Sequence, residues 1–217
     1  MPSLFSLRNV LLAAVAVYAL SVAAAAYERR AAGADTDAIV AAAISMSGAP
    51  ADRAAAMESF MRPMMANYPI VILIGSVITW VLLTTIFFLV LKVTEAGLTW
   101  GTVFAATIYA ALAQTLAGLI LLVALSAARK PTVDDLVQRT FLTTNVAAVL
   151  PADSAAWLVA LGRQLDALTI LYLMVFTGVL SASGRSKASD GALATAVGVT
   201  FALWIVVRVG WAFAFGR

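Results

Sequence analysis

Five long stretches of apolar residues, separated by more polar connections, dominate the sequence. A helix needs about 20 mostly apolar residues to cross a hydrocarbon core of roughly 30 Å, where it satisfies its own backbone hydrogen bonds. The pattern therefore predicts an all-α fold, a polytopic membrane helix bundle with five transmembrane helices in a single integral membrane domain over residues 1–217. The predicted spans cover about residues 10–26, 69–91, 102–125, 164–183 and 191–215.

The longest connection, residues 27–69, contains apolar side chains at helical spacing. Asp52 is placed to cap this helix, and Pro63 is expected to end or kink it. The apolar stripe has two interpretations: an interfacial or partner-binding face, or a helix that packs back onto the bundle, which we favour. Its members are Met57, Phe60, Met61, Met64 and Met65.

A second short amphipathic helix is predicted after Pro131. Thr132 and Asp135 have the spacing of a capping box, with Asp in place of the usual Glu or Gln. The side chains that follow form one apolar stripe, which favours a helix lying along the bundle or the membrane surface. The stripe consists of Val133, Leu136, Val137, Thr140 and Phe141.

The predicted spans contain two charged side chains, Asp166 and Arg208, and one amide near the middle of the third span, Gln114. Asp166 and Arg208 lie on helices joined by a tight turn, each about 25 Å from that turn at 1.5 Å per residue, so they are expected to pair. The pair is interpreted as an ion-pair lock between the last two spans, or as a polar site for an ion, a lipid headgroup or a partner. Gln114 is expected to face another helix, either as packing or along a pathway.

The amino-acid composition limits the chemical functions that the protein can have more than any sequence motif does. Charged residues make up 12% and apolar residues 63% of the chain, far from soluble averages. The chain has no Cys and no His, which removes thiolate metal sites and the commonest general base and metal ligand. The charges form no polybasic run, so nucleic acid binding is not expected. We predict no enzyme activity, no catalytic residues, no metal and no cofactor.

The last third of the chain carries a family resemblance. Similar segments are 165–170 (Leu-Asp-Ala-Leu-Thr-Ile), 178–180 (Gly-Val-Leu) and 186–188 (Ser-Lys-Ala), followed by Trp204. These resemble the bacterial branch of the Yip family, the Ypt-interacting-protein domain, although Leu168 and Leu171 stand where the family often has Phe and Trp. The resemblance implies a five-helix bundle in a bacterial inner membrane with a cytoplasmic amino terminus. Eukaryotic members are linked to vesicle trafficking, and bacterial members have no settled activity.

The distribution of Lys and Arg residues argues against a cytoplasmic amino terminus. With the amino terminus inside, cytoplasmic segments hold Arg8, Lys92, Arg185 and Lys187, while nine other Lys and Arg residues fall on the opposite side. The positive-inside rule favours the reverse. The first span, with its basic start and small residues at Ala24 and Ala26, resembles a signal sequence that we expect to stay uncleaved. Together with the resemblance, it favours an amino terminus inside.

The expected function follows from the lack of catalytic and metal-binding groups in the sequence. We expect a non-enzymatic scaffold or accessory subunit of a membrane complex, or a protein of membrane organisation. Its expected partners are membrane lipids and either another membrane protein or a second copy of the chain. The alternative is a small transporter, channel or lipid-moving protein that uses Gln114, Asp166 and Arg208 along a path.

Overall fold

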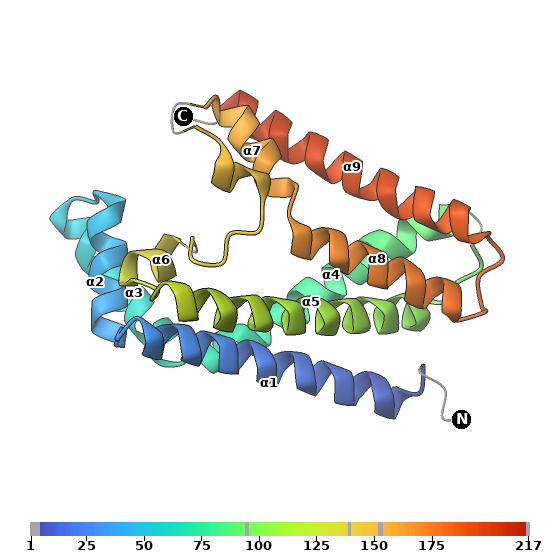
Figure 1. Ribbon diagram of the computed structural model, residues 1–217, viewed down its shortest axis with the longest axis horizontal. Helices are drawn as coiled ribbons and strands as arrows, with labels where there is room; N and C mark the ends of the chain where they lie inside the picture. Colours follow the sequence, from blue (N-terminus) through green and yellow to red (C-terminus); the bar gives the residue numbers. More distant parts are fainter. Residues whose placement is uncertain (1–4, 94–95, 139, 152–153, 216–217) are drawn as a thin grey trace. The chain divides into compact units, whose positions relative to one another are not determined.

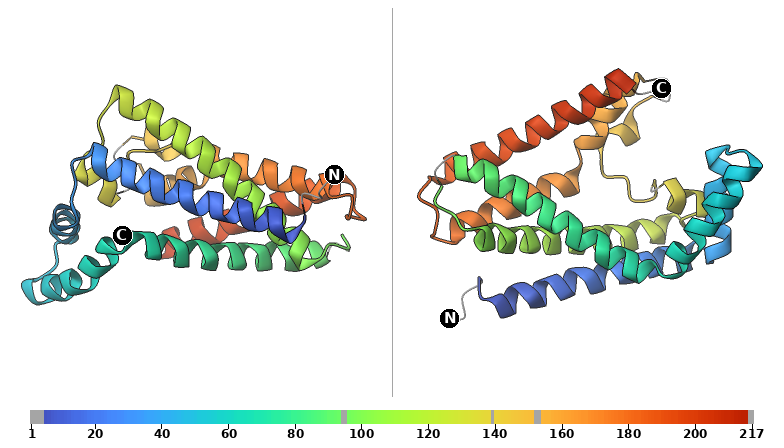
Figure 2. Two further views of the ribbon diagram at one scale, coloured as in Figure 1. Left: turned by 90° about the horizontal axis from the view of Figure 1, so that it is seen from below. Right: turned by 180° about the vertical axis from the view of Figure 1, so that it is seen from behind.

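The computed structural model describes residues 5–93, 96–138, 140–151 and 154–215, and this part of the chain is helical with no strand (Figures 1 and 2). The order of elements follows the apolar pattern along the sequence. The helices are α1 (Leu7–Ala31), α2 (Thr36–Ser47), α3 (Ala51–Ala66), α4 (Tyr68–Val93), α5 (Trp100–Ala128), α6 (Val133–Gln138), the 3-10 turn η1 (Val146–Val149), α7 (Ala156–Gln164), α8 (Ala167–Ala182) and α9 (Asp190–Phe215).

Four helices in the described ranges are long and apolar enough to cross a membrane: α1, α4, α5 and α9. These four confirm the apolar stretches predicted at the corresponding positions. The fifth predicted span, residues 164–183, is not confirmed as a span. Its helix α8 has 16 residues, which gives about 24 Å at 1.5 Å per residue, less than a hydrocarbon core of roughly 30 Å.

The shortened fifth helix has a local cause at its amino-terminal end. Helix α7 ends at Gln164, and Leu165 has a ψ of 71°. Asp166 is extended, with φ −110° and ψ 129°, before the chain becomes helical again at Ala167. The predicted span therefore begins with a break between two helices, and Asp166 lies at the start of α8 instead of inside a continuous span.

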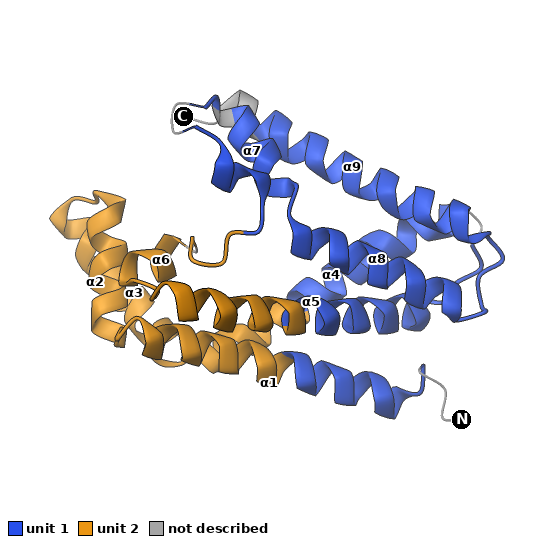
Figure 3. Cartoon of the chain, viewed as in Figure 1, with its two compact units in different colours: residues 1–17, 78–115, 144–217 blue, residues 18–77, 116–143 orange. Residues whose placement is uncertain are grey.

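The chain forms two compact units, each built from separate segments (Figure 3). Unit 1 comprises residues 1–17, 78–115 and 144–217, and unit 2 comprises residues 18–77 and 116–143. Helices α1, α4 and α5 each contribute to both units, because the unit boundaries fall within them.

The core of unit 1 is organised around the amino-terminal half of α5. Its many small residues are buried on several sides, including Ala105, Ala106 and Ala110, which lets neighbouring backbones approach closely. The surrounding helices each contribute one narrow buried stripe. Those stripes are Val10, Ala13 and Val17 on α1; Trp80, Thr84, Phe87 and Leu91 on α4; Tyr172, Phe176 and Leu180 on α8; and Leu193, Ala196 and Val197 on α9.

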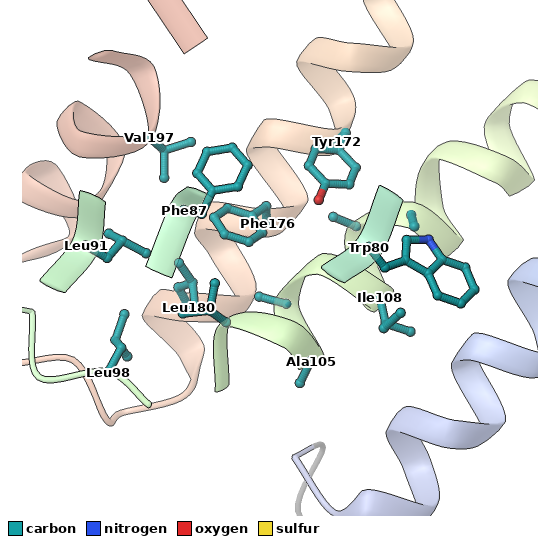
Figure 4. Packing of buried hydrophobic residues seen from close by; sticks show 14 of the residues in the cluster. Trp80, Phe87, Leu91, Leu98, Ala105, Ile108, Tyr172, Phe176, Leu180 and Val197 are labelled. Carbon is teal, nitrogen blue, oxygen red and sulfur yellow. The ribbon is translucent and has the colours of Figure 1, made fainter. Parts of the chain in front are cut away.

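Aromatic rings fill the centre of this core (Figure 4). The ring centroids of Phe87 and Phe176 lie 4.6 Å apart, and those of Tyr172 and Phe176 lie 6.1 Å apart. Such ring pairs stabilise a core beyond the area they bury. They join α4 to α8, so the short helix is firmly held at its middle even though it does not reach the length of a span.

Unit 2 contains a helical head made of α2, α3 and α6. Helix α2, which the sequence analysis missed, has a capping Asp35 that accepts a hydrogen bond from the Ala38 N–H, and it ends at a left-handed Gly48. Arg62 pairs with Asp37 of α2 at 2.7 Å and with Glu58 of its own helix at 2.7 Å. These contacts fix α3 against α2.

Two expectations about α3 are corrected. Asp52 does not cap this helix, because the N-cap is Pro50 and Asp52 lies in the first turn, where a carboxylate still favours the positive end of the helix dipole. Pro63 does not end the helix, which continues to Ala66. The carbonyl of Pro63 accepts hydrogen bonds from the Asn67 backbone N–H and from its side-chain amide, which terminates the last turn.

The predicted capping box before α6 is confirmed. The Thr132 backbone N–H donates to the Asp135 carboxylate at 2.9 Å, and the Asp135 N–H donates back to the Thr132 hydroxyl at 3.1 Å. Asp135 is 8% exposed and also accepts from Arg129 and Thr140. The helix is shorter than its predicted stripe and ends at Gln138, so Thr140 and Phe141 lie beyond it.

Asp135 gives unit 2 an acid-sensitive contact. Burial raises the pKa of this carboxyl, but hydrogen bonds from Thr132, Thr140 and Arg129 outweigh that effect and hold the pKa below its usual value. The charged form therefore stabilises the fold above the unfolded-state pKa of about 4, and this stabilisation is lost as the pH falls through the folded-state pKa.

Replacing Asp135 with Asn should lower the Tm of the purified protein at pH 7, and the difference from wild type should shrink on acidification below about pH 4. Thermal unfolding in detergent, followed by circular dichroism across pH, measures this. Asp134→Asn is the matched control, because Asp134 is adjacent, exposed and carries the same charge. Equal pH dependence in both variants would contradict the role given to Asp135.

Candidate functional site

Asp166 is the best-defined polar centre of unit 1, and its carboxylate caps α8. It accepts hydrogen bonds from the Thr169 backbone N–H at 3.1 Å and from the Thr169 hydroxyl at 3.0 Å. The Thr144 hydroxyl also donates to it. An N-cap side chain satisfies backbone N–H groups that have no partner within the helix. Asp166 thus acts first on the backbone of α8.

The segment around Thr144 is held beside the same helix start by backbone hydrogen bonds. Asn145 and Asp166 form an isolated antiparallel bridge. In this bridge the Val146 N–H donates to the Leu165 carbonyl at 3.1 Å, and the Ala167 N–H donates to the Thr144 carbonyl at 3.2 Å. We call Thr144, Asn145, Asp166 and Thr169 the Asp166 cap cluster.

Two further features mark this cluster as a close-packed junction. Gly162 of α7 lies so near η1 that a Cβ there would stand 2.8 Å from the Ala147 backbone nitrogen, which leaves space for glycine alone. The Asn145 Oδ1 is buried and has no hydrogen-bond donor among the described residues. The cluster therefore holds one acceptor oxygen that the observed contacts leave unsatisfied.

The predicted pairing of Asp166 with Arg208 is not formed. The ion pairs found within the described ranges are Arg62 with Asp37, Arg62 with Glu58, and Arg129 with Asp135. Arg208 is exposed, and its guanidinium carbon lies 4.8 Å from the centroid of the Trp204 ring. It makes a cation–π contact on its own helix instead of a contact with α8.

The arrangement of the last three helices explains this difference. Helices α8 and α9 contact each other near their connecting turn but diverge away from it, and α7 packs beside the carboxy-terminal part of α9 (Figures 1 and 2). The pairing predicted from the sequence assumed that two antiparallel helices stay side by side along their whole length. Similar distance from the turn therefore did not bring the two charges together.

Gln114 is half-buried on α5 and makes no side-chain hydrogen bond to any residue that the structure describes. The buried polar contact between α4 and α5 is made by two threonines that the sequence analysis did not select. The Thr84 hydroxyl donates to the Thr107 hydroxyl at 3.0 Å, and Thr107 donates to the Val103 carbonyl at 3.0 Å. Threonine satisfies its hydroxyl on its own helix at little cost, so sequence hydropathy gives almost no signal for it.

The apolar stripe of α3 divides into two parts. Met57, Met61, Met64 and Met65 are half-buried. The Arg29 guanidinium fixes the carboxy-terminal end of the stripe, because it donates to the Met65 carbonyl at 3.0 Å and lies 4.2 Å from the Tyr68 ring centroid. Phe60 differs from the methionines, since 67% of it is exposed. Most of the predicted stripe is packing, and one aromatic side chain is free for contact.

A recess of about 310 Å³ in unit 2 is lined by Glu28, Asp135, Leu136, Phe141 and Leu142. Its two carboxylates suggest a cation site at first sight. The Asp135 carboxylate, however, is already engaged by Thr132, Thr140 and Arg129, and Glu28 also has a partner. The recess therefore has no carboxylate left over to bind a ligand.

Within the described residues no group of three or more carboxylates lies close enough together to hold a metal ion. Comparison with protein-family models, with curated proteins and with solved structures found no match. The resemblance to the Yip family therefore stays a prediction from the sequence.

A capping role and an ion-pair role for Asp166 predict different effects of substitutions on stability. Asp166→Ala should destabilise the purified protein by about 1 kcal/mol, whereas Asp166→Asn should cost much less, because Asn is an equally good N-cap. Arg208→Gln should leave stability nearly unchanged. Thermal unfolding of the three variants in detergent measures these differences. Equal losses for Asp166→Asn and Arg208→Gln, recovered when the two charges are exchanged, would contradict the capping role.

Proposed function

We propose that the protein is a non-enzymatic integral membrane protein that serves as a scaffold or accessory subunit for another membrane protein. One observation carries this proposal: Phe60 is 67% exposed, whereas the four methionines of the same stripe are half-buried. Aromatic anchors of this kind supply much of the binding energy at protein interfaces. A membrane partner that covers Phe60 would bury a large apolar surface at one point.

The head presents Phe60 in a fixed position. Arg62, one turn away from Glu58, holds α3 to Asp37 of α2, and Arg29 holds the end of α3 at Met65. The Gln138 amide of α6 lies 3.6 Å from the sulfur of Met46 on α2. A preorganised anchor loses less conformational entropy on binding than a flexible one, so these contacts favour recognition by this surface.

The available chemistry also supports a role without catalysis. The chain lacks His and Cys, and the carboxylates of Asp135 and Asp166 are engaged in helix caps. We further propose that the protein resides in a bacterial inner membrane with its amino terminus in the cytoplasm, as the resemblance to the Yip family implies. Eukaryotic members of that family are linked to vesicle trafficking, which agrees with a scaffold.

Phe60 should contact the partner directly in native membranes. A photo-crosslinking amino acid at position 60 should give a discrete adduct, and Phe60→Ser should lower recovery of the same partner at least about tenfold, as expected for an anchor residue. The measurement is co-purification followed by mass analysis. An adduct with a second copy of this chain would identify the partner as a homo-oligomer.

Ala55 is the matched control for that experiment. It is exposed on the same helix, and roughly 140° around the helix axis from Phe60 at 100° per residue. Crosslinking at position 60 and not at position 55 is expected. Equal crosslinking at both positions, or adducts with lipid and no protein, would contradict a specific partner surface at Phe60.

A second candidate function is transport, and the helix break at Asp166 favours it. Short or interrupted apolar helices at membrane depth often surround ion and substrate sites in transporters. Here α7 ends at Gln164 and α8 begins at Ala167, with the unsatisfied Asn145 Oδ1 next to the break. Oxygen atoms from Asn145, Asp166 and Thr144 lie at this break, and oxygen is the ligand that hard cations prefer.

A transport function requires the negative charge of Asp166, whereas its role as a helix cap does not. Asp166→Asn preserves the N-cap but removes the negative charge, so it should abolish Na⁺ or proton flux into proteoliposomes while leaving the protein folded. Arg208→Gln serves as the control and should retain flux. Flux that survives Asp166→Asn, or wild-type vesicles no leakier than empty ones, would contradict transport.

A further inference from the structure

Two turns of unit 1 are bound to each other at one end of the unit. The Lys187 backbone N–H, in the turn between α8 and α9, donates to the Ala96 carbonyl in the turn between α4 and α5 at 2.9 Å. The side chain of Lys187 runs over Gly97, where a Cβ would lie 3.2 Å from the Lys187 methylenes. Gly97 also has a φ of 68°, which favours glycine. The aliphatic part of Lys187 is therefore held in place while its ammonium remains exposed.

Arg185, in the same turn, contacts the segment before α1 and the start of α5. Its guanidinium lies 5.3 Å from the Phe5 ring centroid, just before α1, and donates to the Thr102 hydroxyl of α5 at 3.3 Å. These contacts use one face and one N–H group of the guanidinium. A guanidinium has five N–H donors, so most of its donors stay available on an exposed side chain.

Two more cations belong to the same end of unit 1. Arg8 lies in the first turn of α1, one turn beyond Phe5, and Lys92 lies in the last turn of α4. Both are exposed. In Figures 1 and 2 the start of α1, the end of α4 and the turn between α8 and α9 lie toward the same end of unit 1. We call Arg8, Lys92, Arg185 and Lys187 the basic turn surface.

The basic turn surface carries little compensating negative charge. None of its four cations makes an ion pair with a described residue. The acidic residues in these connections are Glu95, which lies outside the described residues, and Asp190, which accepts a hydrogen bond from Ser181 at 2.6 Å. The one acid of these connections that the structure describes, Asp190, is thus already engaged.

The neighbours of these cations are strongly apolar. Leu7, next to Arg8, is 74% exposed, and Val93, next to Lys92, is 84% exposed. The Trp100 ring at the start of α5 is partly exposed, stacks on Phe104 and donates to the Thr85 hydroxyl. Tryptophan at the end of a span is typical of the membrane interface. Cations and exposed apolar side chains are therefore adjacent at the start of α1 and at the end of α4.

We propose that the basic turn surface binds the phosphate group of an anionic phospholipid. The proposal rests on the membrane location in the proposed function and adds a specific lipid site to it. Arginine donates to phosphate oxygens in a planar, two-point geometry, and lysine adds a point charge. The exposed Leu7 and Val93 beside the cations suit the acyl chains of the same molecule, which a free phosphate ion does not have.

The test uses purified full-length protein in detergent, titrated with phosphatidylglycerol or with phosphatidylcholine of the same acyl chains. Native mass spectrometry counts bound lipid. Wild type should bind phosphatidylglycerol more tightly. The variant Arg8→Gln with Lys92→Gln should bind it about 25-fold more weakly, because each cation near the surface contributes about fivefold. These two side chains make no described packing contact, so the variant should remain folded. Arg185→Gln with Lys187→Gln is the second variant and should show the same loss.

Arg53→Gln with Lys130→Gln is the matched control, because both side chains are exposed, belong to unit 2 and carry the same charge. It should leave the affinity for phosphatidylglycerol nearly unchanged. An equal loss in control and surface variants, or equal binding of the two lipids by wild type, would overturn the site. Displacement of the lipid by inorganic phosphate at matched concentration would assign the site to free phosphate and overturn the lipid. No partner protein is present, so failure here leaves the Phe60 crosslinks as an independent result.

Discussion

The start of α8 depends on a hydrogen-bond requirement that governs the second half of the chain. The first N–H groups of a helix have no partner within it, and in an apolar environment they cannot be left to water. Asp166 satisfies this requirement at Thr169 and also accepts from Thr144. With the helix start satisfied locally, the chain before it can leave the helical path. That freedom allows α7 to pack against α9 instead of extending α8 into a full span.

The core of unit 1 also depends on only a few polar contacts. Hydrophobic attraction does little to hold helices together in lipid, so close packing and a few hydrogen bonds have to do so. The alanines of α5 allow close approach on several sides, the Thr84 to Thr107 contact joins α5 to α4, and the Phe87 and Phe176 rings join α4 to α8. One central helix of small residues surrounded by narrow stripes explains why long, evenly apolar helices still have a defined packing.

Hydropathy and cap spacing anticipated much of this structure, and geometry between helices accounts for the rest. The four long apolar stretches became helices, and Thr132 with Asp135 formed the predicted box, since both signals are local. The Asp35 and Gly48 caps of α2 were also readable signals that were missed. The position of Arg208 relative to Asp166 was not readable, because residue counting gives depth along a helix but not the divergence of two helices. The exposure of Phe60 among half-buried methionines likewise depends on where α2 packs.

The ion pairs in the structure reduce the force with which the count of Lys and Arg residues argues against a cytoplasmic amino terminus. A count of Lys and Arg places more cations away from the basic turn surface than on it. Two of those cations are already neutralised, because Arg62 and Arg129 are paired with carboxylates. The attraction of an anionic leaflet acts on charge that is not neutralised locally. The four cations of the basic turn surface meet that condition, so the electrostatic objection to the proposed cytoplasmic amino terminus is weaker than the residue count implies.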